Sequence, residues 1–98
     1  MKAKFTLAGR RQFLAAVAYI HRDRPAAARR FLSRAEQVLR RLEKLPESGR
    51  VIPEFPELPY REVAVPPYRF FYKVESGTVW IVGAWHSAQQ VQQPNQDA

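Results

Sequence analysis

Apolar residues in the first half of the chain recur at the spacing of an α-helix. One stripe, at steps of three and four residues, is formed by Phe13, Ala16, Val17 and Ile20. Such a stripe is typical of an amphipathic helix with one buried face, and it predicts a helix over residues 8–22. The preceding residues 2–7 are predicted to form a short strand with Phe5 and Leu7 on one face.

A second helical pattern, over residues 25–45, is the clearest in the sequence. Its apolar positions fall within a narrow arc at about 100° per residue, at Ala28, Phe31, Ala35, Val38, Leu42 and Leu45. The other side carries Arg29, Arg30, Arg34, Arg40 and Arg41. Pro25 suits the first turn of this helix, with Asp23 or Arg24 as N-cap, and Pro46 ends it. The tight break between the two helices predicts an antiparallel helical hairpin.

After the prolines of residues 51–59, which predict an extended connection, the period of the pattern changes to two. Three strands are predicted, over residues 60–65, 68–75 and 78–85, with Ser76 and Gly77 forming a hairpin turn. The predicted fold is therefore α+β: a two-layer sandwich of order β-α-α-β-β-β, with the helical hairpin packed on a mostly antiparallel sheet. Residues 1–88 are expected to form one domain, and residues 89–98 a flexible C-terminal tail.

Strand alternation also predicts which aromatic side chains share a face. Trp80 and Trp85 are five residues apart, so they are expected on opposite faces, one in the core and the other exposed in a partner groove. Phe70 and Phe71 are adjacent in a predicted strand, so their side chains are expected on opposite faces of the sheet. One of these two faces is expected to belong to the core.

The amino-acid composition excludes several kinds of functional site and points to the charge of a partner. The chain has no cysteine, two histidines and four glycines, so no thiolate or histidine metal site, no phosphate-binding glycine loop and no cofactor is expected. Sixteen basic residues stand against nine acidic ones, and residues 1–50 alone hold thirteen of the basic residues and four of the acidic ones. This imbalance favours either a polyanionic or acidic partner or a solvated arginine-rich surface. The lack of cysteine and of any long apolar run leads us to expect a cytoplasmic protein.

Several short motifs, in order over residues 3–88, resemble the RelE/ParE superfamily of toxins from bacterial type II toxin–antitoxin modules, which includes plasmid stabilisation proteins. The L-x-x-x-P-x-x-G-R helix exit of that family matches Leu42, Pro46, Gly49 and Arg50. The stretches 61–63 and 67–74 are similar to its R-E-L and Y-R-I-F-Y-R-V strands, and residues 79–86 to its closing strand with a terminal histidine.

The resemblance implies one of two activities. RelE-like members enter the ribosomal A site and cut mRNA, whereas ParE-like members bind and block DNA gyrase. Both kinds are held inactive by a cognate antitoxin, which wraps the toxin with a partly disordered segment. We therefore expect a hetero-oligomer with an acidic antitoxin segment that folds on contact.

For a nuclease, the candidate catalytic residues are Arg61, Arg69 and His86. Arg69 would clamp a phosphate bidentately, and His86 would serve as acid or base. The alternatives are structural: Arg69 pairing with Glu62 or Glu75 across strands, and a hydrogen-bonded structural His86. The candidate contacts for a target or antitoxin are Tyr60, Tyr68, Arg50, Arg30, Arg34 and Arg41.

The sequence departs from the RelE-like pattern at two places. Val63 stands where those toxins carry a second basic residue, and no tyrosine follows Tyr72. The helix exit and the long second helix are closer to ParE-like members, which need a binding surface and no catalytic set. A growth-inhibiting toxin that binds gyrase is therefore the first hypothesis, a ribosome-dependent mRNA endonuclease the second, and an inactive protein-binding family member the third.

Overall fold

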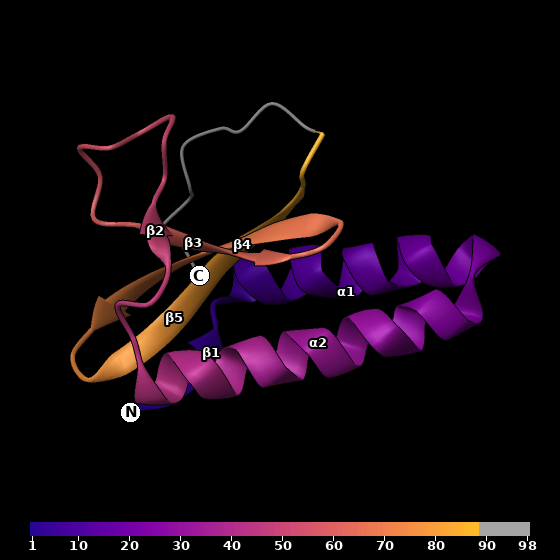
Figure 1. The fold of residues 1–98 in the computed structure, drawn as a ribbon, viewed down its shortest axis with the longest axis horizontal. Helices are drawn as coiled ribbons and strands as arrows, with labels where there is room; N and C mark the ends of the chain where they lie inside the picture. The colour runs from indigo at the N-terminus through magenta and orange to yellow at the C-terminus, as the bar shows by residue number, and fades with distance from the viewer. Residues whose placement is uncertain (89–98) are drawn as a thin grey trace.

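The computed structural model describes residues 1–88; the predicted tail, residues 89–98, lies outside the described part. Two helices pack on one face of a five-stranded sheet, which confirms the predicted α+β sandwich (Figure 1). The elements are β1 (Lys2–Phe5), α1 (Leu7–Asp23), α2 (Pro25–Lys44), β2 (Arg50–Val51), β3 (Arg61–Val65), β4 (Tyr68–Glu75) and β5 (Thr78–His86). No helix among residues 1–88 is long and apolar enough to cross a membrane.

The first strand is shorter than predicted. It ends at Phe5, because Thr6 begins the helix: its side-chain oxygen accepts a hydrogen bond from the Gly9 amide at 3.0 Å, as an N-cap does. Leu7 consequently lies in α1, 50% exposed, and does not share a buried strand face with Phe5. The sequence pattern missed this N-cap.

The helical hairpin forms as predicted, with α1 and α2 side by side and antiparallel (Figure 1). Five of the six predicted apolar positions of α2 are buried: Ala28, Phe31, Ala35, Val38 and Leu42. Leu45, the sixth, is 59% exposed, because the helix ends at Lys44 and Leu45 caps it outside the helical arc. Arg24 occupies the N-cap position of α2 without a side-chain cap hydrogen bond.

The sheet has the strand order β1-β5-β4-β3-β2. All pairs are antiparallel except β1 with β5, which are parallel. The two-residue strand β2 was not predicted, because its sequence is typical of a loop. In the sheet, Arg50 pairs with Glu62 and Val51 with Arg61 of β3. A strand this short has no periodicity of its own, so its partner strand defines it.

Both faces of the sheet are covered. On the helix side the core includes Phe31, Leu42, Val65, Phe70 and Ile81. On the other side a second cluster of Ile52, Tyr60, Phe71 and Val82 packs with Phe55, Leu58, Trp80 and Trp85. The proline-rich connection between β2 and β3 supplies part of this second cluster, which is why both Phe70 and Phe71 are buried.

The prediction that the two tryptophans face opposite sides is wrong. Trp80 and Trp85 both join the second cluster. The register between β4 and β5 shifts after the pair Phe71 and Gly83, so that Tyr72 pairs with Ile81 and Val82 is the extra residue. A β-bulge of this kind reverses the alternation beyond it, and Trp85 therefore returns to the face of Trp80.

Tyr72 on β4 connects the segment that follows α2 to the sheet. The Tyr72 hydroxyl donates to the Pro46 carbonyl oxygen at 2.8 Å and accepts from the Gly49 amide at 2.9 Å. Burial raises the pKa of this phenol, which favours the protonated form that donates to Pro46. The Leu42–Arg50 motif thus ends in a structural anchor.

Replacing Tyr72 with phenylalanine is expected to lower the free energy of unfolding by about 1–3 kcal/mol, because the buried Gly49 amide loses its acceptor. Urea unfolding followed by tryptophan fluorescence measures this loss. The matched change Tyr19→Phe, at a side chain 62% exposed, should cost less than about 0.5 kcal/mol. Equal effects of the two changes would contradict the anchoring role.

Candidate functional site

The three candidate catalytic residues lie on two faces of the sheet. Arg61 shares the helix-side face with Val63 and Val65, and its Nη1 donates to the Gly49 carbonyl oxygen at 3.0 Å. Arg69 lies on the opposite face, with its guanidinium 5.4 Å from the centroid of the Phe71 ring. The two guanidinium groups are therefore separated by the sheet itself.

His86 lies on the helix side, beside the first residue of β4. It pairs with Tyr68, whereas Arg61 pairs with Tyr72. Four residues of strand separate these positions, about 13 Å. The imidazole makes an edge contact with the Tyr68 ring, at 5.3 Å between centroids, and its Nδ1 accepts from the Ala88 amide at 3.0 Å. The structure does not bring His86 to either arginine.

Arg69 is held by two carboxylates. Its Nη1 and Nη2 donate to the two carboxylate oxygens of Glu54 at 3.1 and 3.0 Å, and Nη2 also contacts Glu62. The Arg69 side chain is 14% exposed and that of Glu62 only 5%. The carboxylates raise the pKa of Arg69, and the Arg69 hydrogen bond lowers the pKa of Glu54. Both terminal nitrogens of this guanidinium are thus already bound to carboxylates.

Arg50 completes a chain of alternating charges on this face. Its Nε donates to Glu62 at 2.8 Å, while its side chain is 69% exposed. Arg50, Glu62, Arg69 and Glu54 thus neutralise one another around a hollow that Ser48 and Ser87 also line. Glu62 was predicted as a partner of Arg69, but Glu54 was not: it lies in the proline-rich connection, and nothing in the local pattern pairs it with β4. The other proposed partner, Glu75, lies near Lys73.

The two candidate contact tyrosines lie inside the protein. Tyr60 is 1% exposed and Tyr68 8%, so neither presents its ring to a partner in this conformation. Burial, with a smaller contribution from Tyr19, raises the pKa of the Tyr68 phenol. Tyr19 itself is exposed and lies beside Tyr68 and His86 around a hollow on the helix side.

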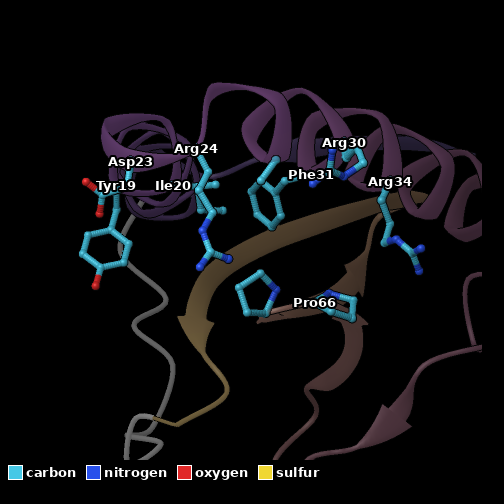
Figure 2. A pocket seen from close by; sticks show the side chains of 10 residues that line it. Tyr19, Ile20, Asp23, Arg24, Arg30, Phe31, Arg34 and Pro66 are labelled. Carbon is cyan, nitrogen blue, oxygen red and sulfur yellow. The ribbon is translucent and has the colours of Figure 1, made fainter.

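The candidate arginines of α2 are exposed. Arg30 and Arg34, but not Arg41, line a hollow of about 580 Å³ between the joint of the two helices and the β3–β4 turn. Figure 2 shows this hollow, with the Phe31 ring between Arg24 and Arg34 and with Pro66 of the turn below. Sequence reasoning missed Arg24, Pro66 and Pro67 as members of this surface, since their proximity to α2 arises only from packing.

No group of three or more metal-ligating side chains occurs within residues 1–88. What the described residues offer is thus a neutralised charge cluster on one face and an arginine-lined hollow at the helical hairpin. The first suits structural stabilisation, and the second suits binding of an anionic partner.

Comparison with known proteins assigns the chain to a family. A search of curated proteins finds no significant match. Residues 3–91 match the family described as the ParE toxin of the type II toxin–antitoxin system, parDE, a match that spans nearly the whole chain and bears out the resemblance to the RelE/ParE superfamily. The chain therefore belongs to the ParE toxin family of type II toxin–antitoxin systems.

Proposed function

We propose that this toxin acts by binding and not by cleavage: it arrests growth by occupying an essential target such as DNA gyrase in the cytoplasm. A cognate antitoxin neutralises it by forming a hetero-oligomer. Family membership supports the toxin role, and the choice of a binding mechanism rests on the geometry of the described residues.

The observation that carries the proposal is the separation of Arg61, Arg69 and His86. Cleavage of RNA by its 2′-hydroxyl needs a base, an acid and positive charge around one phosphate. Arg69 points away from the helix side and is bound by Glu54 and Glu62. Arg61 and His86 pair with β4 residues four positions apart, Tyr72 and Tyr68. These three side chains do not surround a common space.

The basic helical hairpin supports neutralisation by an acidic partner. Ten basic residues and three acidic ones occur in residues 7–44, and most of the basic side chains are exposed. The exposed intrahelical pair of Arg40 and Glu36 offsets only one of these charges. A surface of this kind attracts an acidic segment and speeds its association.

Two assays with the purified chain test the proposal. We expect it to inhibit supercoiling of relaxed plasmid DNA by gyrase and to leave mRNA intact in a defined translation reaction. New mRNA ends at the A-site codon, absent with a His86→Ala variant, would overturn it in favour of a ribosome-dependent endonuclease. A chain that leaves gyrase, mRNA and cell growth unaffected would overturn it in favour of an inactive, protein-binding family member.

A further inference from the structure

We propose that one flank of α2 binds the phosphate backbone of double-stranded DNA, independently of the base sequence. Four basic side chains lie along this flank and are here called the arginine row: Arg30, Arg34 and Arg41 of α2 and Arg61 of β3. The inference deepens the proposed function and rests on it in one respect: DNA is chosen over double-stranded RNA because gyrase acts on DNA.

The three members of the arginine row on α2 share one side of the helix. At about 100° per residue they fall within an arc of about 40°, on the flank opposite to Leu39, which packs against the core. From Arg30 to Arg41 the helix rises about 16 Å. This length corresponds to about five phosphates of one DNA strand, which follow one another at about 3.4 Å along the duplex axis. The arginine row can therefore follow one strand of a duplex.

Arg61 joins the arginine row where the end of α2 packs against β3. Burial raises the pKa of the Tyr72 phenol, whereas the positive charges of Arg61 and Arg41 lower it, so both guanidinium groups lie near that hydroxyl. A hydrogen bond of 3.0 Å from Arg61 Nη1 to the Gly49 carbonyl oxygen fixes the guanidinium in this place. Toward the other end of the row, Arg34 extends from α2 in the direction of the β3–β4 turn (Figure 2).

Contacts inside the protein do not neutralise the arginine row. Its three members on α2 are exposed, and among residues 1–88 they form no ion pair and no side-chain hydrogen bond. Arg69, by contrast, is bound by two carboxylates. Two acidic side chains lie near the ends of the row: Asp23 in the hollow at one end, and Glu47 near Tyr72 at the other. The surplus of positive charge along the row attracts a polyanion.

The arginine row offers charge without exposed apolar side chains between the arginines. Phe31 and Val38 each lie one turn from Arg34 on the helix surface, and they are only 3% and 7% exposed. A peptide that docks on a helix face relies on apolar anchor residues, for which these buried side chains provide no contact. A phosphate backbone needs no such contact, because its affinity comes from the release of counterions. The planar guanidinium also matches the geometry of a phosphate.

The aromatic residues favour a duplex over a single strand. Proteins that bind single strands stack the unpaired bases on exposed aromatic rings. Tyr60 and Tyr68 are 1% and 8% exposed, so they cannot serve in this way. Tyr19 is 62% exposed but lies only in the hollow at one end of the arginine row. A duplex keeps its bases stacked and presents its phosphates, which are the groups that the row can bind.

The test titrates a fluorescein-labelled DNA duplex of about 20 base pairs with the full chain, from about 50 to 200 mM salt, and follows fluorescence anisotropy. The double variant R34Q/R41Q should weaken binding at least about tenfold and lower the steepness of log Kd against log salt by about two, because two phosphate contacts are lost. The matched control R11Q/R29Q removes the same charge from exposed positions outside the arginine row, and it should weaken binding less than about threefold. A second duplex of unrelated sequence should bind equally well.

Three outcomes would overturn the inference. Equal weakening by both double variants would reduce the effect to general charge attraction. Tighter binding of the single strand, or of an RNA duplex of the same sequence, would assign the arginine row to another nucleic acid. A glutamate-rich peptide that binds as tightly as the DNA duplex, and that R34Q/R41Q weakens more than R11Q/R29Q does, would assign the row to an acidic protein.

Failure of the arginine row and failure of the proposed function give different results. A chain that inhibits gyrase but binds the duplex equally well with and without Arg34 and Arg41 contradicts only the role of the row. A chain that binds the duplex through the row but leaves gyrase active contradicts only the proposed function.

Discussion

Replacing Gly9 with alanine is expected to destabilise the protein by about 3 kcal/mol, although alanine is ordinarily the better helix former. A Cβ at this position would lie 2.2 Å from the Ile81 carbonyl oxygen and 2.9 Å from its carbonyl carbon. Those atoms belong to the backbone of β5, which also accepts the Thr6 amide at 3.0 Å. The first turn of α1 would have to move away from the sheet, breaking the N-cap contact.

Urea unfolding of the Gly9→Ala variant measures this effect. The control is Ala18→Gly on the exposed side of the same helix, which should cost about 1 kcal/mol by helix propensity alone. The two positions should thus show opposite preferences between glycine and alanine. A Gly9→Ala variant as stable as the parent would show that α1 does not need this close approach to β5.

The second large effect is expected at Arg69. Replacing it with methionine should lower the free energy of unfolding by about 3 kcal/mol, because Glu62 is 5% exposed and would retain only Arg50 as a charged partner. Removing one member of a buried pair costs far more than removing an exposed one. The matched change Arg40→Met, at the exposed pair with Glu36, should cost less than about 0.5 kcal/mol.

A double-mutant cycle separates charge from packing at this site. If the loss in Arg69→Met comes from the uncompensated Glu62 carboxylate, the further change Glu62→Leu should recover at least half of it. Strictly additive losses would instead assign the effect to the lost contact of the Arg69 guanidinium with the Phe71 ring. The same variants bear on function, since a destabilised Arg69 variant would lose activity without any catalytic role for the guanidinium.

The arginine network also shows how far the sequence could predict the candidate site. Opposite charges made Glu62 or Glu75 the predicted partner of Arg69, as the structural alternative to a catalytic role, and the structure shows the pairing with Glu62. The bidentate partner Glu54 could not be predicted, because the path of the proline-rich connection back over β4 depends on the packing of Ile52 and Phe55 against the sheet.

Where the prediction from the sequence put a side chain in the wrong place, the cause was a backbone feature that leaves no recognisable pattern in the local sequence. Trp80 and Trp85 were predicted on opposite faces but share one, because the bulge at Val82 reverses the alternation, and a bulge depends on the register between two strands. Leu7 was assigned to a strand although Thr6 caps a helix there, because four residues are too few to separate a strand from a helix start.

The sequence by itself determined the helical hairpin, the antiparallel strands that follow it and the family to which the chain belongs. These follow from periodicity and motif order, which are local and repeated over many residues. Only the tertiary structure decided that β1 runs parallel to β5 at the sheet edge, and that Arg69 and Arg61 lie on opposite faces. It also placed Arg24, Arg30 and Arg34 around one groove with the proline turn. Such juxtapositions join residues far apart in the chain, and they depend on how the apolar faces pack, which no local pattern encodes.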